Sequence, residues 1–189
     1  MRNDVIIQNL MNAKEILDKY CPNALCREVL ERHGHAIYAM IEEICDKHDL
    51  KPDFSFLQRA SLLHDIGCVR VRSPRMGCYG SLPYISHGVE GAKIMRELGD
   101  EACARVCECH IGAGLSREDI ESENIALPPE DYLPQSLEEQ LICYADNFYS
   151  KNPLQLEVRA QWQEIEEEAR AWGPRAQSRL QALHEKFRL

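Results

Sequence analysis

Apolar residues recur at spacings of three and four along most of the chain, which is the pattern of helices that bury one face. The first such stretch covers residues 4–20, and a longer one follows Pro22. His33 falls on the apolar stripe of the longer stretch, whose other members are Leu25, Val29, Ile37, Met40, Ile41 and Ile44. No segment alternates apolar and polar residues convincingly enough to predict a strand. The pattern therefore predicts an all-α protein.

Capping residues and glycines set the ends of the remaining predicted helices. One helix is predicted over 54–66, capped by Asp53 and ended by Gly67, and another over 87–98, capped by Ser86 and ended by Gly99. A short helix is predicted from Asp100 to about residue 110. Two more helices begin with capping boxes, at Ser116 to Asp119 and at Ser136 to Glu139. The last of them carries Asp146. Residues 67–86 are rich in Gly and Pro and are predicted to form a long loop, which in a compact domain usually serves a function.

The composition changes beyond Pro153 to Gln, Glu, Arg and Trp, and Gly173-Pro174 divides this part into two predicted helices. We expect one domain over residues 1–152 and a C-terminal helical extension over residues 153–189. An apolar stripe in the extension would pack back on the domain or, as the alternative, form a homodimer interface. Its members are Trp162, Ile165, Ala169 and Trp172.

Length and cysteine usage point to a reduced, cytoplasmic protein. The 189 residues suffice for one domain that buries about 70% of its unfolded surface without disulfides. Nine cysteines, an odd number with no Cys-x-x-Cys pair, indicate free thiols that mostly pack in the core. The first 17 residues have helical spacing with interspersed charges, which is not the pattern of a signal or transit peptide.

The charge excludes two classes of partner. A formal net charge of −9 argues against a general binder of nucleic acids or anionic membranes, because such proteins present broad Lys/Arg surfaces. No apolar run approaches the roughly 20 residues needed to cross a bilayer. A local basic pocket remains compatible with the sequence, and residues 70–75 are its densest candidate.

The segment "SLLHDIGCVR", residues 61–70, places His64 and Asp65 among apolar neighbours. A second pair, His48-Asp49, lies in polar surroundings and is predicted to be a solvated helix end. Burial of His64-Asp65 requires partners, which are either a metal ion or hydrogen bonds within a packed helix. On a helix the two side chains would point about 100° apart, so a shared cation would lie deep, near a helix junction.

Other metal-ligating residue types fall at helix ends or on apolar stripes. They are His33, His87, His110 and Asp146. Taken singly, each is explained as a satisfied core residue or a helix C-cap. Taken together with His64-Asp65, they are candidates for one metal site.

These residues follow the order H…HD…H…H…D in the segments "ERHGHAIYAM", "ASLLHDIG", "SHGVEGAKIMRELG", "CECHIGAGLS" and "ICYADNFYS". In this order the chain resembles the HD-domain superfamily of metal-dependent phosphohydrolases, and in particular its small single-domain HDIG members of unassigned substrate. The resemblance covers residues 33–147. It implies an all-helical bundle with the metal site among its central helices.

The resemblance also implies roles for the candidate residues. His33, His64, Asp65 and Asp146 would hold a first metal, with His35 as the rival of His33. His87 and His110 would hold a second metal bridged by Asp65, or, beside a single metal, contact substrate phosphate or donate protons. Asp65, His87 and His110 are thus the expected catalytic residues.

The ligand types indicate which metals fit. Mixed imidazole and carboxylate ligands suit Fe, Mn, Ni, Co or Zn, with Mg as a further option, and the lack of thiolate disfavours a structural zinc. Arg70 and Arg72 are candidates for neutralising the substrate phosphate, with a solvated loop as the alternative, and Lys93 is a weaker candidate. Cys68 stands where many family members carry a Lys, so that charge must come from elsewhere. Cys103, Cys107 and Cys109 could be imagined as a thiolate site but are expected to pack in the core.

The expected function is hydrolysis of a small phosphoester, such as a nucleotide or a phosphorylated metabolite, by metal-activated water. Two alternatives use the same residues. Some two-metal relatives of the superfamily use a diiron centre to activate oxygen and cleave C–H or C–P bonds. The other alternative is a binding module without catalytic activity. It is considered because Cys68 replaces a lysine that many family members carry.

Overall fold

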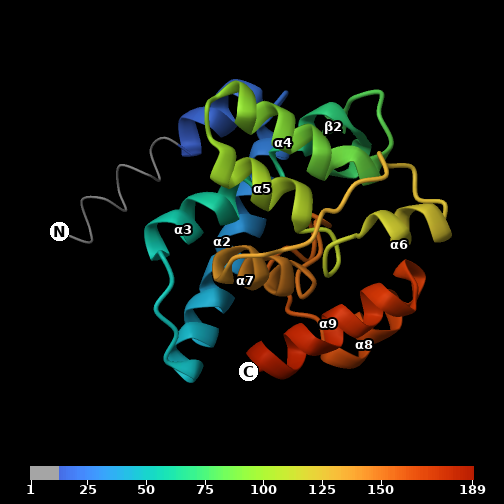
Figure 1. Cartoon of the computed structure of the whole chain (residues 1–189). Coiled ribbons are helices and arrows are strands. Elements are labelled where there is room, and N and C mark those ends of the chain that lie inside the picture. The colour runs from blue at the N-terminus through green and yellow to red at the C-terminus, as the bar shows by residue number, and fades with distance from the viewer. Residues whose placement is uncertain (1–12) are drawn as a thin grey trace.

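The computed structural model describes residues 13–189, and most of these residues are helical (Figure 1). The predicted all-α class is confirmed. The α-helices after residue 20 are α2 (Ala24–His48), α3 (Phe54–Leu63), α4 (His87–Glu97), α5 (Glu101–Cys109), α6 (Arg117–Ser122), α7 (Leu137–Asp146), α8 (Trp162–Glu168) and α9 (Pro174–Phe187). Shorter elements connect them, namely the 3-10 turns η1 (Ile66–Arg70), η2 (Pro74–Met76), η3 (Tyr84–Ser86) and η4 (Ala169–Trp172) and the strands β1 (Arg72–Ser73) and β2 (Cys78–Tyr79). Of the predicted helix over 4–20, residues 13–20 are helical and the rest lies outside the described residues. Each helix between residues 13 and 189 is too short or too polar to span a bilayer.

The long helix α2 runs through the middle of the molecule and packs against α3 and α7 (Figure 1). It begins where the side chain of Asn23 accepts a hydrogen bond from the backbone N–H of Cys26. Gly34 lets α3 approach closely, because a Cβ at this position would lie 2.5 Å from the carbonyl oxygen of Ser61. This contact brings the middle of α2 beside the end of α3, where His64 and Asp65 lie.

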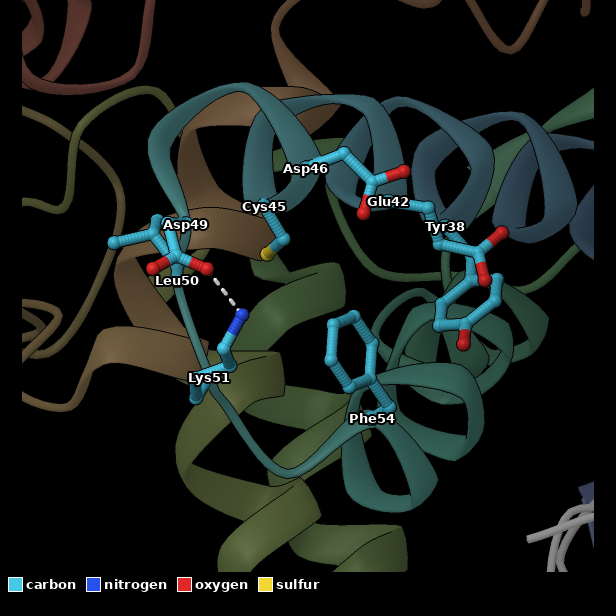
Figure 2. A pocket seen from close by; sticks show the side chains of 8 residues that line it. All are labelled: Tyr38, Glu42, Cys45, Asp46, Asp49, Leu50, Lys51 and Phe54. Carbon is cyan, nitrogen blue, oxygen red and sulfur yellow. Dashed lines mark hydrogen bonds and ion pairs between the residues drawn. The ribbon is translucent and has the colours of Figure 1, made fainter.

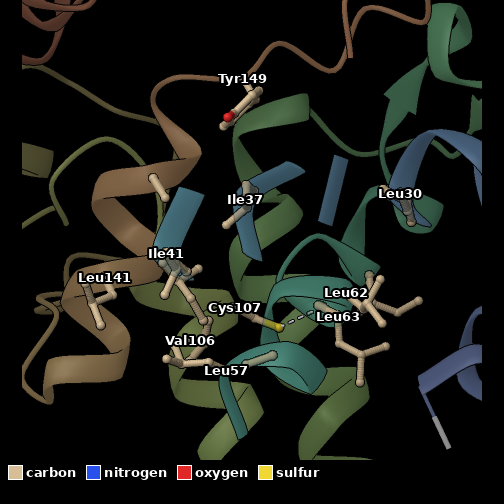
Figure 3. Close-up of a cluster of buried hydrophobic side chains, with 14 of the residues drawn as sticks. Leu30, Ile37, Ile41, Leu57, Leu62, Leu63, Val106, Cys107, Leu141 and Tyr149 are labelled. Atoms are coloured by element: carbon tan, nitrogen blue, oxygen red, sulfur yellow. Dashed lines mark hydrogen bonds between the residues drawn. The ribbon is translucent and has the colours of Figure 1, made fainter. Parts of the chain in front are cut away.

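The main core fills the space among α2, α3, α5 and α7 (Figure 3). Its fully buried side chains include Ile41, Leu57, Leu63, Val106 and Leu141. All nine cysteines lie in the described residues and are free thiols, and every one except Cys21 is buried. Cys107, for example, donates a hydrogen bond to the carbonyl oxygen of Leu63 with a sulfur–oxygen distance of 3.4 Å.

Helix α3 ends at Leu63 rather than at residue 66, which corrects the boundary expected from Gly67. His64 takes the C-cap position, and Asp65 leaves the helical conformation with φ −100° and ψ 8°. Gly67 is not a helix terminator but a point of close approach to α4, because a Cβ there would lie 1.9 Å from the carbonyl oxygen of His87. The two residues of the motif are therefore not consecutive positions of one regular helix.

Two further details differ from the expected boundaries. Ser86 precedes α4, but its side chain makes no capping hydrogen bond, because η3 runs directly into α4. The loop over residues 67–86 contains the antiparallel pair β1–β2, in which Arg72 lies opposite Tyr79. Each of these strands has only two residues, so the sequence shows no alternation of apolar and polar positions that could have predicted them. The predicted caps at Asp53 and Asp100 and both capping boxes are present.

The C-terminal helix α9 lies against α7 and the end of the core, and α8 packs beside α9 (Figure 1). Leu180 and Phe187 of α9 are buried in the same core cluster as α2. The hydroxyl of Tyr144 on α7 donates a hydrogen bond to Nδ1 of His184, and the ring of Trp162 stacks on that imidazole with centroids 3.6 Å apart. As the Gly173-Pro174 pair predicts, the chain turns there between η4 and α9.

Candidate metal centre

Six residues from five separate segments converge on one buried volume. His33 comes from the middle of α2, His64 and Asp65 from the end of α3, His87 from the first turn of α4, His110 from the end of α5, and Asp146 from the end of α7. They form two groups whose ligand atoms lie within 4.8 Å of one another, and Asp65 belongs to both. This cluster can hold metal ions.

The first group joins His33 and His64 to the two carboxylates. Nε2 of His33 lies 2.8 Å from Oδ1 of Asp146 and 3.4 Å from Oδ2 of Asp65. Nε2 of His64 lies 3.2 Å from the same Asp65 oxygen and 3.4 Å from Asp146 Oδ1. Of these side chains only Asp146 is measurably exposed, at 11%. His35, the rival of His33, is exposed outside this group.

The second group uses the other oxygen of Asp65. Oδ1 of Asp65 lies 3.4 Å from Nε2 of His87 and 3.4 Å from Nε2 of His110, and these two nitrogens are 3.1 Å apart. One carboxylate thus turns one oxygen toward each pair of imidazoles. A carboxylate placed in this way can bridge two cations.

Backbone carbonyls orient three of the imidazoles. Nδ1 of His64, His87 and His110 donates to the carbonyl oxygen three residues earlier, at 2.8, 2.7 and 2.7 Å. Such bonds fix the ring orientation and leave Nε2 as the atom available to a metal. All three Nε2 atoms face Asp65.

Buried polar atoms without hydrogen bonds indicate that a cation fits. Among the described residues, Nε2 of His64 is buried without a hydrogen-bond partner and faces Oδ2 of Asp65, which forms an ion pair with Lys151 but no hydrogen bond. Buried polar groups are rarely left in this state, because desolvation without a partner costs about 1–3 kcal/mol. A divalent cation between the imidazoles and carboxylates would satisfy both atoms.

The electrostatics favour carboxylates over carboxylic acids in the site. Burial alone would raise the pKa of Asp65 and Asp146, but the neighbouring charges of Lys151 and His64 outweigh it and hold both pKa values well below the usual range. Burial lowers the pKa of His33 to about 4 and that of His87 to about 3. Ionised carboxylates and neutral imidazoles are the forms that bind metals.

Metal binding at neutral pH is expected to release a proton from His64. Burial lowers the pKa of this imidazole, but the charge of Asp65 outweighs burial and raises it to about 9, so the ring of the metal-free chain is protonated at pH 7. Metal affinity should therefore rise by up to about tenfold per pH unit until the pH passes that pKa. Calorimetric titration with Mn²⁺ in buffers of different ionisation enthalpy counts the released protons, and a count of zero at pH 7 would contradict the expectation.

Lys151 is a site residue that the sequence analysis missed. Its Nζ lies 3.0 Å from Oδ2 of Asp65 and 3.2 Å from Oδ1 of Asp146. The side chain is 13% exposed, and the pKa of its ammonium is raised well above the ordinary value because the two carboxylates outweigh burial. Lys151 therefore places a positive charge against Asp65. Cys68 supplies none, since burial raises the pKa of its thiol well above the ordinary value.

The three predicted phosphate-binding residues lie elsewhere. Arg70 donates to Glu90 and Glu97, and Lys93 donates to Glu90 at 2.6 Å. Arg72 is exposed on β1. None of the three lines the cavity beside the metal ligands.

A cavity of about 330 Å³ opens on the cluster. Its lining includes His87, His110, Asp146 and Lys151 of the cluster. The same cavity is also lined by Tyr84, Ile111, Glu168 and Trp172. A larger hollow of about 560 Å³ at the C-terminal end of α2 shares no residue with the cluster and is lined by Glu42, Asp46 and Asp49 among others (Figure 2).

Comparison with known proteins finds relatives over most of the chain. An uncharacterized protein of Methanocaldococcus jannaschii is 39% identical over 127 residues, which are 65% of this chain and 68% of that protein. Two proteins named tRNA (cytidine(56)-2'-O)-methyltransferase are also similar, at 31% identity in Thermoplasma volcanium and 29% in Picrophilus torridus. These alignments cover 66% and 65% of this chain but only 36% and 32% of the two enzymes. No solved structure is a significant match.

Comparison with protein families matches residues 25–150 to the family described as HD domain. The matched range covers more than half of the chain and contains His33, His64, Asp65, His87, His110 and Asp146. The relation expected from the order of these residues is confirmed. The chain belongs to the HD domain family.

Proposed function

We propose that the protein is a metal-dependent phosphohydrolase that acts on a small phosphoester. The observation that carries the proposal is Asp65, a buried carboxylate that turns Oδ2 toward His33 and His64 and Oδ1 toward His87 and His110. HD domains are typically metal-dependent phosphohydrolases, and this arrangement suits one or two divalent ions of Fe, Mn, Ni, Co or Zn, with Mg as a further option.

His33, His64, Asp65 and Asp146 would hold a first ion, and Asp65, His87 and His110 a second. Bound divalent ions of this kind lower the pKa of a coordinated water and neutralise phosphoryl oxygens. Beside a single ion, His87 and His110 would instead contact the phosphate or protonate the leaving group, since both residues line the cavity.

Lys151 supports the phosphoester as substrate. Its ammonium lies at the junction of the cavity and the carboxylates and can donate charge-assisted hydrogen bonds to a phosphoryl oxygen. A small substrate is favoured over tRNA, the molecule in the name of two relatives, because the chain carries a net charge of −9.

Metal analysis followed by activity screening tests the proposal. Protein purified without chelators should contain divalent transition metal and hydrolyse at least one phosphomonoester or phosphodiester in a panel supplemented with Mn²⁺, Co²⁺, Ni²⁺ or Mg²⁺. Metal without turnover across the panel would favour a binding module. A mixed-valence iron signal with oxygen consumption on addition of substrate would favour an oxygenase.

A further inference from the structure

The cavity beside the metal ligands is completed by residues outside the matched HD domain range. The match ends at residue 150, whereas Glu168 and Trp172, which line the cavity together with His110 and Asp146, come from the C-terminal helices. His87, His110 and Asp146 thus come from the HD domain range, whereas Glu168 and Trp172 come from the segment that follows it. Glu168 and Trp172 share the cavity with the metal ligands, so they could contact the organic part of a substrate whose phosphate lies at those ligands.

Packing against neighbouring apolar side chains holds Trp172 beside the cavity. Its side chain packs against a small apolar cluster formed by Ile111, Leu115, Ile120 and Tyr132. Gly112 lies beside the indole, since a Cβ there would be in van der Waals contact with Cδ1 of Trp172 at 3.7 Å. The ring is only partly buried, so part of it is open to the cavity.

An ion-pair network around the buried carboxylate of Asp119 joins α6 to α9, the helix that follows Trp172. Asp119, whose side chain is 2% exposed, accepts from Arg175 at 3.0 Å and also from Arg179. Arg179 donates in addition to the carbonyl oxygen of Gly114 at 2.8 Å, in the turn that borders the cavity. The two guanidinium groups are partly exposed, but the carboxylate that they share is buried and would be left unpaired without them. The network therefore restrains the start of α9, which follows Trp172 directly.

A second aromatic ring lines the same cavity. Tyr84 stacks on the imidazole of His87, with centroids 4.7 Å apart and planes 30° apart, and is 40% exposed. Aromatic surfaces bind flat rings through dispersion and stacking, with little dependence on the identity of the ring. Glu168 adds an exposed carboxylate that would repel a second phosphate and accept hydrogen bonds from hydroxyl or amino groups.

We propose that Trp172, with Tyr84, binds the face of a planar ring in the organic part of the substrate, so that the enzyme prefers phosphoesters bearing such a ring and a single phosphate. This specificity rests on the proposed phosphohydrolase function. The role of Trp172 is to position the substrate, and the chemical step stays with the metal ligands and Lys151.

Binding of phosphonates tests this inference without requiring turnover. In calorimetry on the full chain loaded with Mn²⁺, phenylphosphonate should bind about tenfold more tightly than methylphosphonate, a ratio typical of one stacked ring. Trp172→Ala should reduce the ratio to near one while the affinity for methylphosphonate changes little, and Trp172→Phe should keep most of the preference. Trp162→Ala is the matched control, because this second tryptophan of the C-terminal helices stacks on His184 outside the cavity and should leave the ratio unchanged.

The outcomes separate this inference from the proposed function. Equal binding of the two phosphonates by the wild type, or an unchanged ratio in a folded Trp172→Ala variant, overturns the ring site and leaves the hydrolase untouched. A preference for phenylphosphonate that depends on Trp172, in a protein that hydrolyses no phosphoester, supports the ring site and contradicts the proposed hydrolase function. Loss of binding of both phosphonates in Trp172→Ala also overturns the inference, provided that thermal unfolding shows a native fold, since the indole would then hold the phosphate pocket rather than the ring.

Discussion

Replacing Asp65 by Asn is expected to lower turnover by on the order of 10³-fold or more and to remove most of the bound metal. The amide matches the carboxylate in size, so the packing of this 1% exposed side chain is kept. It offers no negative charge to the imidazoles on either side, and it cannot bridge two cations. Metal content by elemental analysis and kcat/KM on the best substrate of the panel measure the two effects.

The chain supplies a matched control in its second His-Asp pair. Asp49→Asn makes the same chemical change beside His48, where the carboxylate is 87% exposed and pairs with Lys51. Asn tolerates the left-handed conformation of this residue, φ 51°, so the variant should keep its stability, metal content and activity. Full turnover in Asp65→Asn would rule out the mechanism.

Lys151→Met is expected to change metal affinity and substrate affinity in opposite directions. The ammonium contacts Asp65 Oδ2 and Asp146 Oδ1, the same oxygens that a first metal would need, so its removal should tighten binding of Mn²⁺ to the substrate-free protein. Loss of a charged donor to the phosphoryl group should raise KM and lower kcat/KM by about 10- to 100-fold. Calorimetry with Mn²⁺ and steady-state kinetics give the two readouts.

Opposite shifts distinguish this role from a structural one, since a destabilised site would lose both affinities. Lys51→Met is the control, because this lysine is 78% exposed and also pairs with a carboxylate, at a place remote from the cluster. Lys151→Arg should restore part of the substrate affinity. Weaker metal binding in Lys151→Met would show that the ammonium supports the metal site rather than competing with it.

The sequence identified the six candidate ligands that lie together in the structure, but not the backbone geometry that brings them together. His33 could be chosen over His35 because it lies on the apolar stripe of its helix, and in the structure it is fully buried while His35 is exposed. The end of α3 could not be placed, because the glycine of the motif normally marks a helix end and here serves a contact between backbones. That contact involves α4, which is distant in sequence.

The positions of Lys151 at the metal cluster and of Trp172 beside the cavity could not be predicted, for two different reasons. Lys151 lies in an irregular segment beyond α7, where no periodicity relates its side chain to Asp146. Trp172 belongs to a stripe whose spacing fits a regular helix, but α8 ends at Glu168 and the chain continues as the 3-10 turn η4. The change from 3.6 to 3.0 residues per turn rotates Trp172 away from the face that Ile165 buries. Local pattern rules fail where the helix type changes.

The contact at Gly67 joins the backbone of η1 to that of α4, and so relates the positions of Asp65 and His87. The second residue of the motif and the first residue of α4 are held at a fixed separation by main-chain atoms alone, since a Cβ at Gly67 would also lie 2.2 Å from the backbone nitrogen of Gly91. Any side chain at Gly67 would clash with the backbone of α4 and force η1 and α4 apart. Because His87 opens α4, whereas His33 lies on α2 and His64 at the end of α3, we expect a single added methyl group at Gly67 to disturb the second ligand group more than the first.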